Sequence, residues 1–397
     1  MSVTLFVIKE MESIVSLADW LNPDPDLMED VDSFRETCLS VYEQDPNRIL
    51  EDLRKEYSIA EGGYGRKQVQ ELLQNGADAL RESPGRLFVH LTHDCLYVAN
   101  QGKPFTSDGL RGILYAHLSE KTGEEIGRFG LGFKSIAGIS SNPQIFSQSV
   151  SFAFDRSSAH QTLHEKIDSD LKFDDVPALR FAWPIEPVQE FDDDPLLRDL
   201  AKWAVTVVKV PLFDDAAIEL DKEIREFDES FCLFVPAVRQ LTIKSEISDT
   251  FKSFSVIRSG EGRRQVELRD AEGQSTHWFV VSRKHIPSAS ALENAGRTAK
   301  RETVDVSWAV PLEGKAKIGQ LAAYFPVKSE VSLSGKLNAP WKLSDDRIDL
   351  IEGEFNEEIL ATVVPELVSE ARQFLGSRDP GRYICLLYTS DAADEED

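Results

Sequence analysis

The stretch ELLQNGADA, residues 71–79, lies inside a helix that the sequence predicts over residues 66–80. Apolar residues recur through this segment at helical spacing, at Val69, Leu72, Leu73, Gly76 and Leu80. Glu71, Asn75 and Asp78 stand at i, i+4 and i+7, so they share one face opposite the apolar stripe. The pattern therefore predicts an amphipathic helix with an amide and two carboxylates in one row.

This row of polar side chains can be interpreted in two ways. Asn75 offers a neutral oxygen to Mg²⁺, which prefers oxygen ligands and takes few of them from protein. Glu71, one turn earlier, could orient and deprotonate an attacking water. The simpler alternative is the solvated polar face of an amphipathic helix.

A second segment, LYVANQGKPF at residues 96–105, follows a predicted hairpin with strands at 87–91 and 96–99. The strand delivers Asn100 to a glycine turn, where its side-chain oxygen could accept a hydrogen bond from an adenine amine. Gly102 would allow the backbone to approach a base closely. The alternative is a common turn at the end of a strand.

A third segment, GRFGLGFKS at residues 127–135, carries three glycines before an apolar run. Gly127, Gly130 and Gly132 suit a loop whose backbone N–H groups cradle phosphates. Lys134 would add positive charge there, or would simply lie at the surface.

In combination, ELLQNGADAL, VANQGKPF and IGRFGLGFKS resemble the three boxes of the GHKL ATPases, which include gyrase, ninety-kilodalton heat-shock chaperones, histidine kinases and MutL. The GFKS ending is most similar to the sacsin-like and heat-shock-chaperone branch. The resemblance implies ATP and Mg²⁺ as cofactors, Glu71 as catalytic base and Asn75 as metal ligand. It also implies a set of nucleotide-binding residues: Asn75, Asp78, Asn100, Gly102, Gly127, Gly130, Gly132, Phe133, Lys134 and Thr206.

Two flanking features extend this resemblance, and one residue departs from it. Thr206, in Ala-Val-Thr-Val-Val, matches a late strand that supports the adenine pocket. A later stretch, YFPVKSEVSLSGKLNAPWKLSDDR, resembles a sacsin-like second domain, which makes Lys328 and Arg347 candidates for a γ-phosphate contact; otherwise they are surface cations. Asn100 stands where the family has aspartate, which implies weaker affinity or a relaxed base preference because charge-assisted hydrogen bonds are stronger.

The expected fold class is α+β. The resemblance implies a GHKL (Bergerat) α/β sandwich with a mixed, mostly antiparallel sheet and helices on one face, followed by a smaller α+β transducer-like domain. Residues 106–126 would form a lid. The expected divisions are 1–60, an N-terminal helical extension; 61–212, the ATP-binding domain; 213–353, the second domain; 354–384, a truncated helix; and 385–397, a tail.

The tail CLLYTSDAADE resembles the translation of a transposase sequencing adapter, so we expect native sequence to stop near Ile384 and the natural protein to be longer. The alternative is an ordinary acidic tail.

The composition bounds the partners. The 397 residues carry a net charge of −25, which disfavours general nucleic-acid binding. No apolar run is long enough for a membrane span, and four scattered cysteines fit a reducing cytoplasm. The sequence thus predicts slow, Mg²⁺-dependent ATP hydrolysis that drives conformational change in a chaperone-like or sacsin-like protein. The alternative is a non-hydrolysing, nucleotide-gated dimerisation or interaction module; a homodimer and a protein client both stay open.

Overall fold

A computed structural model describes residues 17–61, 67–115, 133–296, 302–313, 317–344 and 348–375. Its α-helices are α1 (Pro25–Gln44), α2 (Asn47–Glu61), α3 (Gln68–Ala79), α4 (Ser107–Leu114), α5 (Arg156–Lys166), α6 (Pro187–Asp193), α7 (Pro195–Ala201), α8 (Ala216–Arg225), α9 (Phe231–Phe234), α10 (Ala289–Ala295), α11 (Glu354–Glu358) and α12 (Val364–Phe374). None of these described helices is long and apolar enough to cross a membrane.

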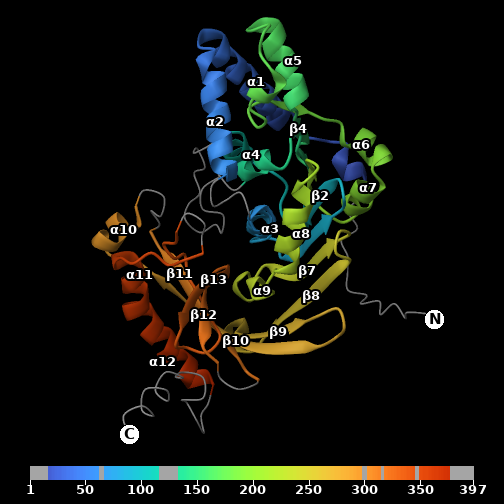
Figure 1. Ribbon diagram of the computed structural model, residues 1–397. Helices are drawn as coiled ribbons and strands as arrows, with labels where there is room; N and C mark the ends of the chain where they lie inside the picture. The colour runs from blue at the N-terminus through green and yellow to red at the C-terminus, as the bar shows by residue number, and fades with distance from the viewer. Residues whose placement is uncertain are drawn as a thin grey trace, which may run out of the picture.

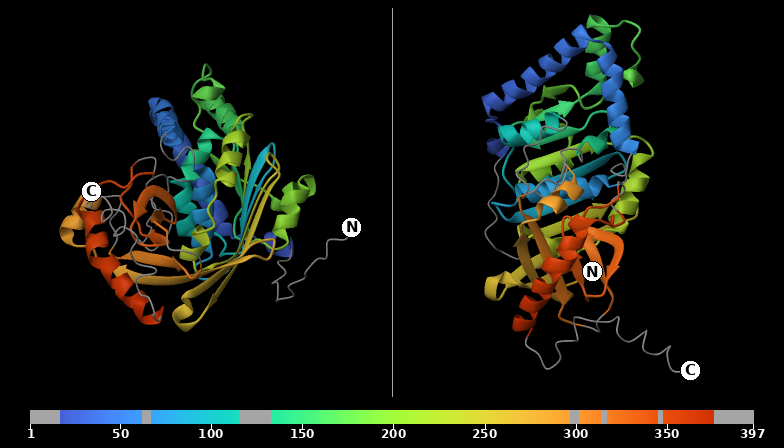
Figure 2. Two further views of the ribbon diagram at one scale, coloured as in Figure 1. Left: turned by 60° about the horizontal axis from the view of Figure 1, so that its bottom comes forward. Right: turned by 90° about the vertical axis from the view of Figure 1, so that its left-hand side faces the viewer.

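The strands are β1 (Gly85–Leu91), β2 (Cys95–Asn100), β3 (Gln144–Ser147), β4 (Phe152–Phe154), β5 (Ala182–Pro184), β6 (Thr206–Pro211), β7 (Val238–Ser245), β8 (Thr250–Ser259), β9 (Gln265–Arg269), β10 (Ser275–His285), β11 (Val304–Pro311), β12 (Gly319–Ala323), β13 (Phe325–Val331) and β14 (Lys336–Asn338). They form one mixed sheet in the order β13-β12-β14-β11-β10-β9-β8-β7-β1-β2-β6-β3-β4-β5. The fold is therefore α+β, as the sequence predicts, and the sheet curves around α3, α8 and α9 (Figures 1 and 2).

The centre of the sheet joins segments far apart in the chain. β1 pairs antiparallel with β2, as the predicted hairpin requires, and pairs in parallel with β7 on its other side. Strand β7, which follows residue 213, is hydrogen-bonded to β1, which precedes it. One sheet therefore spans the expected boundary between residues 212 and 213. Helices α3 and α8 contact each other and both contact β1, so they cover one face of this central region.

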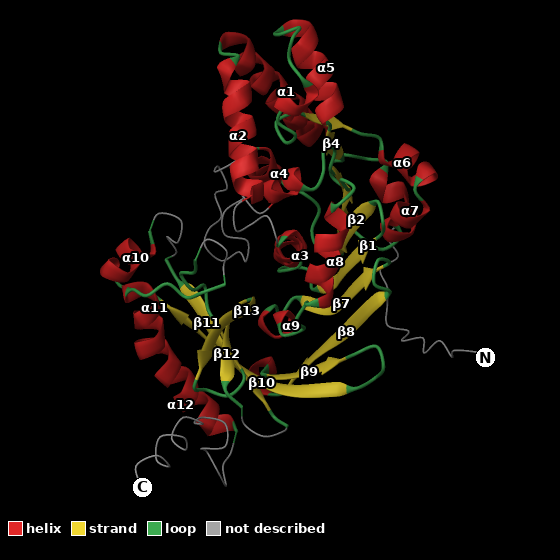
Figure 3. Ribbon diagram, viewed as in Figure 1, coloured by secondary structure: helices red, strands yellow, loops and turns green. Residues whose placement is uncertain are grey.

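Helices also cover the opposite face, so the expectation of helices on one face is wrong. Tyr97 and Phe146 point into a separate apolar cluster with Trp20, Phe191 and Leu197, which come from the short 3-10 helix η1 (Leu17–Trp20), α6 and α7. The physical reason lies in β2, whose run Leu-Tyr-Val-Ala is apolar on both faces and needs cover on both. Figure 3 shows α6 and α7 across the sheet from α3 and α8.

The C-terminal strands have a second apolar core, closed by α11 and α12. A π-helical turn, Ile359–Val363, joins these two helices. Pro365 follows this turn and has no N–H to donate, which accounts for a turn that departs from α geometry there. Phe325 of β13 stacks on Phe231 of α9 at 4.8 Å between ring centroids, and both rings belong to the main core, so β13 contributes to the main core as well as to the second one.

Candidate functional site

The helix that bears Glu71 and Asn75 is buried on most of its circumference. Glu71 is only 4% exposed, whereas Asn75 and Asp78 are partly exposed. The solvated-face alternative therefore fails for Glu71. Burying a carboxyl group is costly unless other groups stabilise it, so its position needs an explanation beyond surface polarity.

The beginning of α3 is capped from a distant part of the chain. Lys67 occupies the N-cap position and its side chain makes no capping hydrogen bond. Instead, the carboxyl group of Glu223 on α8 accepts hydrogen bonds from the backbone N–H groups of Val69 (3.1 Å) and Gln70 (2.7 Å). Burial raises the pKa of Glu223 to about 8, although these two hydrogen bonds and Lys67 oppose the rise. Sequence reasoning missed Glu223, because no local motif marks it.

Asn100 ends β2 with its side chain turned back onto the following backbone. Its Oδ1 accepts a hydrogen bond from the N–H of Gly102 at 2.9 Å, and the side chain is 5% exposed. A Cβ added to Gly76 of α3 would lie 3.8 Å from both Cβ and Nδ2 of Asn100. The structure therefore brings the second segment directly against the helix of the first. A carbonyl oxygen has two lone pairs, so Oδ1 could still accept one further hydrogen bond.

Gly102 is required by the end of α3. A Cβ on Gly102 would lie 2.4 Å from both the carbonyl carbon and the carbonyl oxygen of Ala79, closer than real side chains come. The N–H of Lys103 donates to that same Ala79 oxygen at 3.0 Å. The glycine thus permits a close contact between the turn and α3. The sequence predicts Gly102 only as a position where the backbone can approach a base.

Thr206 lies beside Asn100, because the two residues are direct partners in the β2–β6 pairing. The Thr206 hydroxyl donates to Oγ of Ser147 at 3.2 Å, and the N–H of Phe105 donates to the same Oγ at 3.1 Å. Ser147 is buried at the end of β3 and ties the segment after Gly102 to the sheet. It was not predicted, since a single serine at a strand end carries no recognisable signal.

Lys134 lies in the interior, so the surface alternative proposed for it is wrong. It is 3% exposed and belongs to the 3-10 helix η3 (Phe133–Gly138). Its Nζ donates to the carbonyl oxygens of Leu179 (3.2 Å) and Leu114 (3.4 Å) and lies 5.2 Å from the ring centroid of Phe154. Burial lowers the pKa of Lys134, and the charge of Glu56 opposes this shift.

Glu56 of α2 is a buried acid whose charge acts on Lys134. Its carboxyl oxygens accept hydrogen bonds from the N–H groups of Ala178 (2.7 Å) and Leu179 (2.8 Å), and burial raises its pKa. The N–H of Leu179 thus donates to Glu56, and the carbonyl oxygen of Leu179 accepts from Lys134. This arrangement links the N-terminal helices to the residue that follows the predicted glycine loop.

The structure does not place every predicted residue in this group. Gly127, Gly130, Gly132 and Arg347 lie outside the described residues. Phe133 is buried in the main core, where its ring lies 6.1 Å from that of Phe154. Lys328 is exposed on β13, and its contact with a phosphate stays a prediction.

No protein-family model and no curated protein sequence matches the chain. Among solved structures, the chain is similar to the crystal structure of the N-terminal domain of a DNA repair protein, with a TM-score of 0.38 and 10% sequence identity. The alignment covers 78% of this chain and 95% of that one. At this TM-score the likeness assigns neither a fold family nor a function.

The geometry defines what this region can do chemically. It combines a partly exposed amide side chain at Asn75, a buried carboxyl group at Glu71 and a buried amide at Asn100, all on or against α3. No group of three or more His, Cys, Asp and Glu residues suited to a metal occurs in the described ranges. Asn75 could supply one oxygen to a Mg²⁺ ion whose other ligands are phosphate and water.

Proposed function

We propose that the chain binds Mg²⁺-ATP between α3 and the β2–β6 end of the sheet, as a GHKL-type ATPase, and hydrolyses it slowly to drive a change of shape. One observation carries this proposal. The turn at Asn100–Gly102 packs against α3, which bears Glu71 and Asn75, while Thr206 pairs with Asn100. Residues from three separate segments thus meet in one region.

The proposed roles follow from the chemistry of each side chain. Asn100 and Thr206 would bind the adenine, with the free lone pair of Asn100 Oδ1 accepting from the exocyclic amine. Asn75 would give Mg²⁺ one oxygen, and Asp78 would contact the nucleotide from the next turn of α3. Glu71, held in a buried position, would orient and deprotonate the attacking water.

The phosphates would be held by the third segment and covered by a lid. Gly127, Gly130 and Gly132 would present backbone N–H groups to the phosphate oxygens. The lid would begin at α4, whose approach is fixed because the N–H of Phe105 donates to Ser147 and its carbonyl oxygen accepts from Ser149 Oγ at 2.8 Å. Closure of such a lid completes the site and excludes water.

Three cationic residues would contact phosphate only under stated conditions. Lys134 would contact phosphate only after exchanging its two backbone carbonyl partners for phosphate oxygens. Lys328 and Arg347 would contact the γ-phosphate when the C-terminal part of the chain closes on the nucleotide.

The test is ATP turnover by the purified protein and by Glu71→Ala. We expect a steady, slow release of phosphate from the wild type and a loss of about 100-fold or more without the base. Glu82→Ala is the matched control, because Glu82 is an exposed carboxylate just beyond α3 that pairs with Lys103 at the surface. Equal turnover by Glu71→Ala would show that Glu71 is not the base.

A non-hydrolysing, nucleotide-gated interaction module is the second candidate. Asn100 favours it, because its Oδ1 is already engaged by Gly102 and a neutral amide binds an amine less strongly than a carboxylate. Light scattering with a nonhydrolysable ATP analogue distinguishes the two. A change in assembly state on binding, without turnover by the wild type, would favour the gated module.

A further inference from the structure

The N-terminal turn of α3 depends on a carboxyl group that lies more than 150 residues away in the sequence. The first N–H groups of any helix lack acceptors within the helix, and an N-cap side chain normally supplies one. Lys67 cannot do so, since an ammonium group has no acceptor. Glu223 supplies both oxygens, one to Val69 and one to Gln70.

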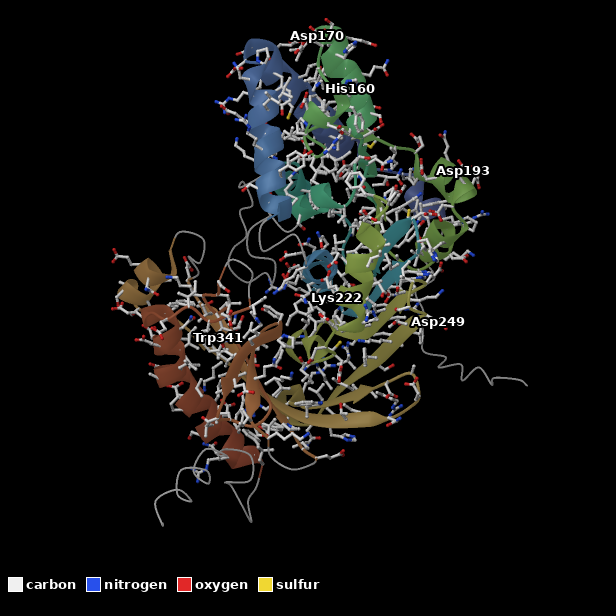
Figure 4. All side chains as sticks on the ribbon, viewed as in Figure 1. His160, Asp170, Asp193, Lys222, Asp249 and Trp341 are labelled. Carbon is white, nitrogen blue, oxygen red and sulfur yellow. The ribbon has the colours of Figure 1, made fainter. Side chains whose placement is uncertain are left out.

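Glu223 itself stands on a firmly anchored helix. Asp221, two residues earlier on α8, accepts hydrogen bonds from the hydroxyls of Ser245 and Ser248, both at 2.6 Å, and from Arg225 Nε at 2.9 Å. Ser245 is the last residue of β7, the strand that pairs with β1. Lys222, adjacent to Glu223, marks the position of α8 near α3 in Figure 4. A continuous set of contacts thus runs from the sheet through α8 to the start of α3.

The position of the cap determines which function it can affect. Glu71 directly follows Gln70, whose N–H makes the shorter of the two hydrogen bonds to Glu223. Asn75 lies more than a turn further along the helix, and Asn100 is fixed separately by Gly102. Fraying or tilting of the first turn would therefore displace Glu71 well before it displaced the residues proposed to bind nucleotide.

We infer that Glu223 is a positioning residue that holds Glu71 in place for ATP hydrolysis by capping α3 from α8. This inference rests on the proposed ATPase function and adds a residue to it. In this role Glu223 contacts neither substrate nor metal; it acts through the backbone N–H groups of Val69 and Gln70. The assignment also connects the catalytic base to β7, from which the C-terminal strands extend.

The experiment compares Glu223→Gln with wild type in the full chain. The substitution keeps the shape of the side chain but replaces one acceptor oxygen with an NH₂ group, which faces a backbone donor. We expect turnover to fall about 10-fold or more, since small misplacements of a catalytic group have large effects on rate. The Kd for Mg²⁺-ATP, measured by calorimetry, should change by less than about 3-fold, because binding rests on other residues.

Glu219→Gln is the matched control. Glu219 lies one turn before Glu223 on α8, is exposed, and is the same residue type. It should behave as wild type in both measurements. A general loosening of the fold would instead weaken binding and turnover together, which separates positioning from a merely structural role.

Amide hydrogen exchange supplies a readout that needs no nucleotide. The amides of Val69 and Gln70 should exchange faster in Glu223→Gln than in wild type, with little change at the C-terminal end of α3. Wild-type turnover in Glu223→Gln, or unchanged exchange at both amides, would overturn the inference and leave the ATPase proposal intact. A folded wild type that binds no Mg²⁺-ATP would instead refute the proposed function, and a wild type that binds without hydrolysis would refute the positioning role.

Discussion

Replacing Gly102 with alanine should destabilise the protein, because the turn after β2 presses directly on the last turn of α3. The new Cβ would lie 2.4 Å from the carbonyl carbon and oxygen of Ala79, and 2.8 Å from its Cβ. The first two atoms belong to helix backbone and cannot rotate away. The turn must therefore move outward until these separations exceed 3.0 Å, the lower limit for real contacts.

The cost of this movement has two parts. Overpacking a tight buried contact costs about 1–3 kcal/mol. The displacement also strains the hydrogen bond from Lys103 N–H to Ala79 and the one from Gly102 N–H to Asn100, and losing one of them costs about 1 kcal/mol. We therefore expect the free energy of unfolding to fall by about 2–4 kcal/mol.

Urea unfolding followed by circular dichroism measures the effect, with Gly112→Ala as the control. Gly112 lies within α4, and within the described part of the chain a Cβ there would meet no atom within 4 Å beyond its chain neighbours and the backbone of α4 itself. Alanine is the better helix former, so Gly112→Ala should match wild type or stabilise it by up to about 1 kcal/mol. Equal midpoints for Gly102→Ala and wild type would refute the packing argument; a lowered midpoint for Gly112→Ala would show that α4 is not ordered as described.

Two further predictions concern the buried pair behind η3. Glu56→Ala would leave the N–H groups of Ala178 and Leu179 buried without their acceptor, so we expect a loss of about 2–4 kcal/mol in urea unfolding, against less than about 1 kcal/mol for Glu51→Ala at the surface. Burial lowers the pKa of Lys134 from its ordinary value of 10.5 to about 8 in the folded protein. Between these two pKa values the unfolded chain therefore binds more protons than the folded chain does. The free energy of unfolding should therefore rise with pH across this window in wild type more than in Lys134→Met, and parallel curves for the two proteins would contradict the burial of a charged amine.

The sequence predicted those parts of the fold that local patterns determine. The helix expected over residues 66–80 is α3, Gln68–Ala79, and the expected hairpin is β1 and β2. Helical spacing and strand alternation are properties of consecutive residues, so they can be recognised without tertiary contacts. Of the helix expected over residues 354–384, the part from Glu354 to Phe374 is helical, with a π turn before Pro365, and residues 376–384 lie outside the described residues.

Other features depended on neighbours that no local pattern reveals. Glu223 caps α3 only because the parallel pairing of β1 and β7 brings α8 beside it. Ser147 reaches Thr206 only through the β3–β6 register. The helices on the second face of the sheet follow from the two-sided apolar character of β2, whereas the resemblance implied helices on one face only. The sequence predicts Lys134 beside phosphates or at the surface. In the structure its Nζ is buried and donates to the backbone carbonyl oxygens of Leu114 and Leu179.

Calorimetric titration of Mg²⁺-ATP into the purified chain, beside Asn75→Ala, tests the central claim most directly. Binding precedes hydrolysis, and the partly exposed amide of Asn75 is the proposed metal ligand on α3. We expect saturable binding by the wild type and clearly weaker binding by Asn75→Ala, with the circular dichroism spectrum unchanged. A folded wild-type chain that binds no Mg²⁺-ATP, or one that binds it as tightly after Asn75→Ala, would contradict the proposed site.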